Sequence, residues 1–101
     1  VVPAAFNTTT GPAHWEILLR TRAIDNQLFV VGASPATNPV ASYHAWGHST
    51  VVDPWGSVLA STGGTETVLW ADLDLSRIEQ VRKALPLLRH RRTDLYTLKR
   101  R

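Results

Sequence analysis

The sequence contains no cysteine, which excludes disulfide bonds and thiolate-ligated metal sites. It also has no apolar run near the roughly 20 residues that a membrane-spanning helix needs, so we expect no membrane partner. The absence of cysteine agrees with the reducing conditions of the cytoplasm, and we expect a cytoplasmic protein.

Acidic residues are scarce at the end of the chain. Asp94 is the single acidic residue of positions 89–101, which hold six of the eleven basic residues, while the rest of the chain carries five basic and seven acidic side chains. A nucleic-acid binder more often spreads basic residues over a folded face or interleaves them with stacking aromatic residues. We therefore interpret residues 89–101 as a basic C-terminal tail and expect no nucleic-acid partner. Binding of RNA or acidic lipid by this tail is the alternative.

The length of 101 residues, with 44% hydrophobic and 19% charged residues, fits one globular domain over 1–101. Periodicity, capping residues and turn residues together predict the order of its elements. They predict a strand over 1–6, a helix capped by Thr9 or Thr10 that runs to about Asn26, a strand over 28–33 covered on both faces, a hairpin, a strand over 67–72, and a helix from Asp74 or Ser76 that Pro86 ends.

The first predicted helix carries apolar residues on two sides, which indicates burial on both. One stripe comprises Trp15, Leu18, Leu19 and Ala23, and Ile17 and Ile24 lie nearly opposite. Arg22 and Asp25 lie within the stripe at i, i+3 spacing. Because a charge that faces a packed interior needs a partner, we expect these two to form a structural ion pair.

A turn joins two strands near the middle of the chain. Asp53, Pro54 and Gly56 suit positions i, i+1 and i+3 of a type I turn. Proline presets φ, the aspartate oxygen bonds the turn backbone, and glycine adopts a left-handed conformation at little cost. The sequence therefore predicts an antiparallel return over residues 57–61.

Three segments together resemble the nitrilase superfamily of carbon–nitrogen hydrolases, and most closely its omega-amidases. They are residues 47–56, which include the turn, residues 11–16 at the helix start, and residues 92–96 in the tail. The resemblance implies an α/β (α+β) fold, the C-terminal half of a nitrilase-type α-β-β-α sandwich without its N-terminal strands and helices. It also implies a homodimer, and it predicts that this chain is the C-terminal part of an enzyme domain from a truncated or split reading frame.

The superfamily uses a Glu, Lys and Cys catalytic set, and the resemblance implies that all three lie upstream of this sequence. Glu16 is no substitute for a glutamate that comes from far upstream, and Lys83 and Lys99 lie in the final helix and the tail. We expect no catalytic residue and no cofactor here. The implied reaction of the intact enzyme is hydrolysis of the amide of a small dicarboxylic acid monoamide through a Cys thioester, with this chain alone inactive. A non-catalytic, dimer-forming interaction module is the alternative.

The resemblance also implies which side chains border the substrate in the intact enzyme. It places the loop after the first strand in the pocket wall, with Phe6, Thr8 and Thr9 as substrate contacts and His14 and Trp15 behind them. An equally consistent interpretation is that Phe6 belongs to the core and the threonines cap the helix.

Two patterns that carry chemistry elsewhere lack support here. His44 and His48 have the spacing of a helical metal-binding pair, but Gly47 and the β-like residues after it argue against a helix, and no third ligand follows. Ser49 lies in a Gly-x-Ser run, yet Val51 stands where a nucleophile elbow needs its second glycine. We therefore expect no metal, and a Ser49 side chain that bonds to backbone.

Overall fold

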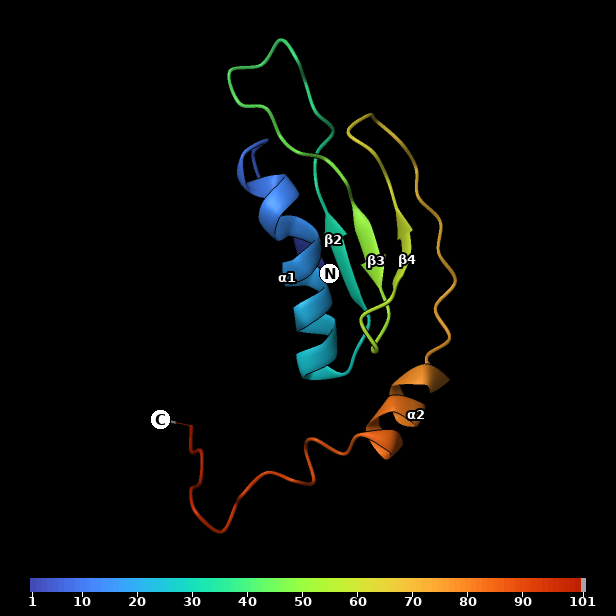
Figure 1. Cartoon of the computed structure of the whole chain (residues 1–101). Coiled ribbons are helices and arrows are strands. Elements are labelled where there is room, and N and C mark those ends of the chain that lie inside the picture. The colour runs from blue at the N-terminus through green and yellow to red at the C-terminus, as the bar shows by residue number, and fades with distance from the viewer. Residues whose placement is uncertain (101) are drawn as a thin grey trace.

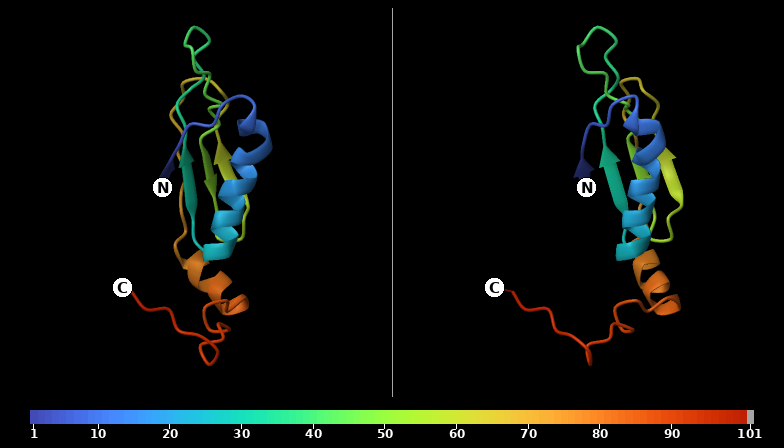
Figure 2. Two further views of the ribbon diagram at one scale, coloured as in Figure 1. Left: turned by 90° about the vertical axis from the view of Figure 1, so that its left-hand side faces the viewer. Right: turned by 60° about the vertical axis from the view of Figure 1, so that its left-hand side comes forward.

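A computed structural model describes residues 1–100 as a mixed α/β arrangement, which confirms the predicted class (Figure 1). One helix packs on a four-stranded sheet, and a second helix lies beyond the end of the sheet (Figures 1 and 2). No helix in this described part is long and apolar enough to cross a bilayer. The elements are β1 (Val2–Pro3), α1 (Thr10–Asn26), β2 (Val30–Ala33), β3 (Thr50–Val52), β4 (Val58–Ser61) and α2 (Ser76–Ala84).

The sheet has the order β1-β2-β3-β4 and mixes both pairing types. β1 is parallel to β2, whereas β2–β3 and β3–β4 are antiparallel, with an irregularity between Val51 and Val52. The predicted strand over 1–6 is shorter than expected, because only Val2–Pro3 form a ladder and Val1 is 91% exposed. Within residues 1–100, β1 pairs only with β2, so its other edge is open.

Helix α1 covers one face of the sheet through an i, i+4 stripe of small and large side chains. Trp15, Leu19 and Ala23 are buried and form the core with Val30 and Val52. This spacing places the three side chains on one side of the helix.

Gly32 in β2 lets the helix approach the sheet. A Cβ at this position would lie 2.5 Å from Leu19 Cδ1 and 2.8 Å from Trp15 Cζ2. Among residues 1–100, β2 is covered on this face alone: Val31 is half-buried and Ala33 is exposed, so the predicted cover on both faces is wrong for this chain. Ile17, on the opposite side of α1, is 62% exposed.

The helix start differs from the prediction. Thr9 makes no side-chain capping bond, and its backbone is already helical at φ −87° and ψ −50°. Asn7 takes that role instead, because its Oδ1 accepts bonds from the Thr9 and Thr10 amides at 3.0 and 2.8 Å and from Thr10 Oγ1 at 3.0 Å. A side-chain oxygen two residues before the predicted cap therefore satisfies the free helix amides.

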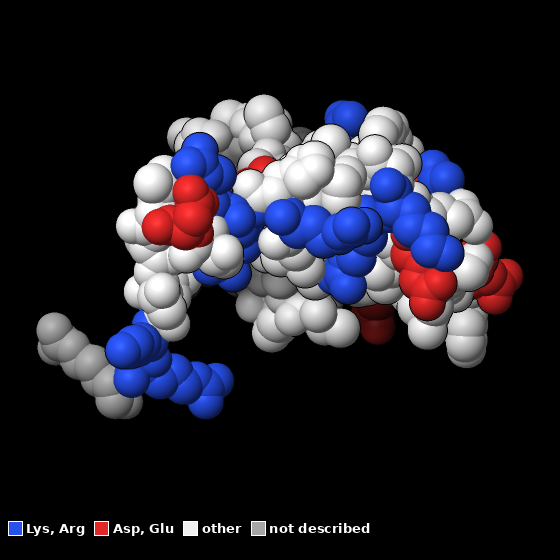
Figure 3. Space-filling view, turned by 90° about the horizontal axis from the view of Figure 1, so that it is seen from below, with Lys and Arg blue, Asp and Glu red and all other residues white. Residues whose placement is uncertain are grey.

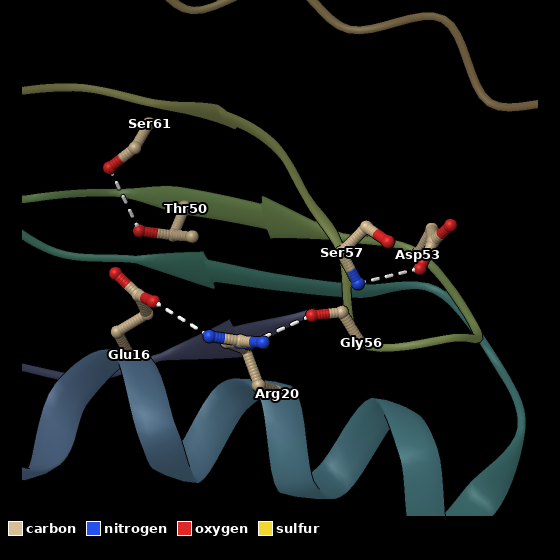
Figure 4. A network of polar contacts seen from close by, with 7 residues as sticks. All are labelled: Glu16, Arg20, Thr50, Asp53, Gly56, Ser57 and Ser61. Atoms are coloured by element: carbon tan, nitrogen blue, oxygen red, sulfur yellow. Dashed lines mark hydrogen bonds and ion pairs between the residues drawn. The ribbon is translucent and has the colours of Figure 1, made fainter.

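The β3–β4 turn has the predicted geometry. The Gly56 amide donates to the Asp53 carbonyl at 2.9 Å, and Gly56 has φ +86°. Asp53 Oδ1 accepts a bond from the Trp55 amide at 2.9 Å. It also accepts a bond from the Ser57 amide at 2.8 Å (Figure 4). One carboxylate oxygen thus closes the turn from inside.

Arg20 ties α1 to this turn. Its Nε donates to the Gly56 carbonyl at 2.8 Å, while its Nη1 lies 3.3 Å from Glu16 Oε1 (Figure 4). Both charged side chains are about half exposed, so the ion pair itself contributes at most about 1 kcal/mol.

The strand predicted over residues 67–72 is absent. This segment descends beside β4 to α2 without a ladder partner in residues 1–100 (Figure 1). Thr67, Val68 and Trp70 favour extended backbone, but a strand also needs a neighbour to accept and donate its hydrogen bonds.

The final helix lies where the sequence predicts it. Asp74 Oδ1 accepts the Ser76 amide at 3.0 Å, and α2 ends before Pro86. Gln27, which ends α1 in the left-handed conformation at φ 51°, donates its Nε2 to the Leu85 carbonyl at 2.6 Å. This bond fastens the end of α2 to the end of α1.

Candidate functional site

The loop between β1 and α1 is held at its base by backbone bonds to a distant segment. The Trp46 amide donates to the Phe6 carbonyl at 2.7 Å, and Asn7 forms an isolated antiparallel bridge with Ala45. The half-buried Phe6 ring packs edge-on against Trp15, with ring centroids 5.3 Å apart and planes at 68°. The phenyl group therefore belongs partly to the core and partly to the surface.

Thr8 and Thr9 follow Phe6 and are exposed. Within residues 1–100, neither hydroxyl makes a hydrogen bond, since the bonds at the helix start go to Asn7. The prediction that Thr9 or Thr10 caps the helix is therefore wrong, and the two hydroxyl groups that follow Phe6 in the chain are exposed.

The two residues that the resemblance places behind this loop, His14 and Trp15, differ in burial. Trp15 is 3% exposed, and its Nε1 donates to the His48 carbonyl at 2.6 Å. His14 is exposed, because neighbouring helix positions point about 100° apart and position 15 faces the sheet.

A second loop, residues 34–43, is hydrogen-bonded to the segment that leads into the first loop. The Tyr43 hydroxyl donates to the Ala5 carbonyl at 2.7 Å, and Thr37 Oγ1 donates to the Ala45 carbonyl at 2.7 Å. Sequence reasoning missed Tyr43, and the one available signal was a lone aromatic residue in a proline-containing loop. The Tyr43 bond joins this loop to the segment that carries Phe6.

Ser49 fixes the other end of the second loop. Its Oγ accepts the Ser34 amide at 3.0 Å and donates to the Ser34 carbonyl at 3.2 Å, so its bonds go to backbone as expected. A small cleft of about 110 Å³ opens beside this pair. Its lining is mostly small and hydroxylated: Ser34, Ala36, Gly47, Ser49, Thr62, Gly63, Thr65, Glu66 and Thr67.

The sequence and fold of the whole chain can be compared with those of known proteins. The model of the carbon–nitrogen hydrolase family matches residues 2–83. This chain belongs to the carbon–nitrogen hydrolase family. The omega-amidase NIT2 of Mus musculus is 58% identical over 98 residues, which are 97% of this chain and 36% of the mouse protein.

Solved structures agree with the assignment to this family. Nit3 of Saccharomyces cerevisiae, a member of branch 10 of the nitrilase superfamily, has a TM-score of 0.83 and 53% identity, covering 87% of this chain and 32% of the yeast chain. The NitFhit protein of C. elegans has a TM-score of 0.84 and 46% identity, covering 92% of this chain and 23% of that chain. The chain therefore has the predicted nitrilase fold and spans about a third of the length of the curated relatives it matches.

The reacting groups used by the superfamily do not come together in this carbon–nitrogen hydrolase chain. It has no cysteine. Glu16 pairs with Arg20 on the exposed surface of α1, and Lys83 lies 4.0 Å from Glu79 with both side chains about four-fifths exposed. No nucleophile, base and lysine therefore meet in residues 1–100.

The expected ion pair between Arg22 and Asp25 is wrong for this chain. Both residues are exposed, and Arg22 Nη1 donates to the Leu18 carbonyl at 3.2 Å. Because both side chains are exposed to solvent, neither charge needs the other as an ion-pair partner.

His44 and His48, the pair with helical metal-binding spacing, do not belong to a three-residue metal-binding group in residues 1–100. His48, at φ 60°, stacks on Trp46 with ring centroids 4.0 Å apart, and its Nδ1 lies 2.7 Å from the Trp46 carbonyl oxygen. Residues 1–100 contain no group of three His, Cys, Asp or Glu side chains that could bind a metal ion.

The basic tail leaves the body beyond α2. Seen from below, a band of Lys and Arg side chains crosses this end of the molecule (Figure 3). Arg92 donates two bonds to Asp94, at 2.8 and 2.7 Å. The same pairing lowers the pKa of Asp94 and raises that of Arg92.

Proposed function

We propose that this chain supplies part of the substrate pocket wall of an omega-amidase-like hydrolase. The intact enzyme hydrolyses the amide of a small dicarboxylic acid monoamide, such as an α-keto amide. The similarity to the mouse omega-amidase over 97% of this chain carries the proposal. The exposed Thr8 and Thr9 side chains, which make no side-chain hydrogen bond, and the half-buried Phe6 ring support the placement of this loop in the wall.

The chemistry of the intact enzyme follows from the superfamily's Glu, Lys and Cys set. The cysteine sulfur attacks the amide carbon, and a glutamate takes the thiol proton and passes it to the leaving nitrogen. The C–N bond of the tetrahedral intermediate then breaks, which releases ammonia and leaves a thioester. A lysine stabilises the negative oxygen, and water then opens the thioester to the acid and free thiol. This chain holds the wall and none of these three groups, so by itself it hydrolyses no amide.

The test is a chimera in which this chain replaces the 98 matched residues of the mouse omega-amidase. We expect ammonia release from an α-keto dicarboxylic acid monoamide within about tenfold of the mouse enzyme. A folded chimera without any turnover would contradict the proposal. In an active chimera, Phe6→Ala or a double Thr8→Ala, Thr9→Ala change should raise KM more than it lowers kcat, because these groups bind substrate and move no proton.

We also propose that the intact enzyme is a cytoplasmic homodimer. Ile17 on the outer side of α1, 62% exposed, supports a contact between copies. Light scattering of the active chimera should give twice the monomer mass, and Ile17→Lys should shift it to the monomer mass.

A further inference from the structure

The end of the molecule beyond the sheet is strongly basic. Residues 82–100 run from the last turn of α2 through the tail and are called the basic end below. They carry seven Lys and Arg side chains and a single acidic one, Asp94, whereas residues 1–81 carry three basic and seven acidic side chains. Figure 3 shows a band of Lys and Arg side chains across this end. The two charge signs are therefore separated along the molecule.

Most of the cations of the basic end lack a carboxylate partner. Arg92 bonds to Asp94, and Lys83 lies 4.0 Å from Glu79. No carboxylate of residues 1–100 lies within 4.0 Å of the remaining five, which are Arg82, Arg89, Arg91, Lys99 and Arg100. Uncompensated charge of one sign attracts a partner of the opposite sign. The basic end therefore fits an anionic partner.

Two of these arginines border a groove at the end of α1. The groove has a volume of about 190 Å³ and is lined by Gln27, Arg82, Pro86, Leu88 and Arg89. Arg82 Nη2 also donates to the Asn26 carbonyl at 3.4 Å. A guanidinium group can donate two parallel bonds to phosphate oxygens, and Pro86 and Leu88 give the same groove an apolar side. The groove therefore suits a phosphate that is attached to an apolar group.

Leucine side chains lie among the basic residues and face solvent. Leu88, Leu95 and Leu98 are 66%, 68% and 78% exposed. In segments that lie on a membrane, basic side chains bind anionic headgroups and apolar side chains enter the acyl boundary. Binding of single-stranded RNA instead uses aromatic stacking, and Tyr96 is the single Phe, Trp or Tyr of residues 82–100. The composition therefore favours a lipid surface over RNA.

We propose that the basic end binds the surface of a membrane that contains anionic lipid. Arg82 and Arg89 bind lipid phosphates, and the exposed leucines enter the apolar boundary. The expectation of no membrane partner concerns a membrane-spanning helix, and no helix in residues 1–100 could span a bilayer. A surface contact needs no such helix, because its side chains enter only the interface. The contact is independent of the proposed function, since it involves no step of amide hydrolysis.

Vesicle co-sedimentation of the full chain tests the inference. The probes are vesicles of phosphatidylcholine alone and vesicles that also contain about 30% phosphatidylserine, an anionic lipid. We expect about tenfold or more chain bound to the anionic vesicles at low salt. About 1 M salt should remove most of this binding, because the Debye length is then about 3 Å. Equal binding to both kinds of vesicle, or binding to neither, would overturn the inference.

Charge-matched variants locate the contact on the molecule. The double change Arg89→Gln, Arg91→Gln and the single change Arg22→Glu lower the net charge equally, and all three arginines are exposed. Arg22 lies on α1 and borders a different groove, with Val2 of β1. The double change should weaken binding to anionic vesicles about tenfold, and Arg22→Glu should leave it within about twofold. Equal losses would show that net charge alone matters and would overturn the assignment to the basic end.

Leucine variants separate a lipid surface from other polyanions. Leu88→Ser with Leu98→Ser should weaken vesicle binding about fivefold or more, because less apolar surface enters the bilayer. Val40→Ser is the control, since Val40 is 91% exposed in the loop at the opposite end of the molecule (Figure 1). Unchanged binding by the leucine variant would overturn the membrane contact. Tighter binding to a single-stranded RNA of mixed sequence than to anionic vesicles would also overturn it.

Discussion

The indole Nε1 of Trp15 donates a 2.6 Å hydrogen bond to the carbonyl of His48, 33 residues away. The same carbonyl accepts the Thr50 hydroxyl at 2.6 Å, so one oxygen joins α1 to the start of β3. Trp15 also supports the Phe6 ring from behind. The candidate pocket wall and the core therefore depend on one side chain.

Replacing Trp15 by phenylalanine should lower the free energy of unfolding by about 2 kcal/mol. The change removes one bond to the His48 carbonyl and part of a buried ring, although Thr50 still satisfies the oxygen. Urea denaturation measures the loss. Thr50→Val removes the second bond to the same carbonyl, and the double variant should lose more than the sum of the single changes because the oxygen is then unsatisfied. Strict additivity would contradict this shared role.

Gly32→Ala should destabilise the chain by about 1–3 kcal/mol. The new methyl group would lie 2.5 Å from Leu19 Cδ1 and 2.8 Å from Trp15 Cζ2, so α1 would have to move away from β2. Gly63→Ala is the matched control, since a methyl group there would have no atom within 4 Å and the φ of Gly63 is not positive. Thermal denaturation of the two variants should differ clearly. Equal melting temperatures would show that the helix is not packed this closely.

Asp53→Ala should cost about 2 kcal/mol of stability. One carboxylate oxygen accepts the amides of Trp55 and Ser57, and alanine leaves both without that partner. Asp53→Asn keeps an oxygen at the same position and should recover most of the loss. If asparagine were as damaging as alanine in urea denaturation, the charge of Asp53 and its 4.0 Å contact with Arg77 would be the stabilising feature instead.

The tail pair gives a pH-dependent signal. The hydrogen bond from Arg92 lowers the pKa of Asp94 below the ordinary value of about 3.9. The contribution of the pair is therefore complete above that ordinary value and is lost as the pH falls through the lowered pKa. In an NMR titration the Asp94 carboxyl should have a lower midpoint in the parent chain than in Arg92→Ala. Both side chains are more than half exposed, so added salt should reduce the difference, and identical midpoints at low salt would rule out the pair.

Local signals predicted the parts of the fold that local chemistry determines. The Asp53 turn follows from residues within four positions of one another, and the extent of α1 follows from its apolar period and its flanking residues. The Asn7 cap was missed because capping rules examine the residue next to the helix, whereas Thr9 is already in helical conformation here. The capping oxygen is on Asn7, two residues before the position that the capping rule examines.

Contacts between distant residues could not be predicted from sequence. The Tyr43 hydroxyl meets the Ala5 carbonyl across 38 positions, and no pattern in residues 34–43 indicates that partner. The segment 67–72 also depends on a distant contact. Its side chains favour a strand, but residues 1–100 do not provide the neighbouring strand that it would need. The resemblance predicts Phe6, Thr8 and Thr9 as substrate contacts. The structure adds that the Thr8 and Thr9 hydroxyls make no hydrogen bond within residues 1–100.

Ammonia release by this chain, alone and after co-refolding with the unmatched part of the mouse omega-amidase, tests the central claim most directly. With an α-keto dicarboxylic acid monoamide as substrate, the account predicts no release by the chain alone and release in proportion to complex formed. Turnover by the chain alone, in proportion to its concentration and unchanged by repeated purification, would contradict it.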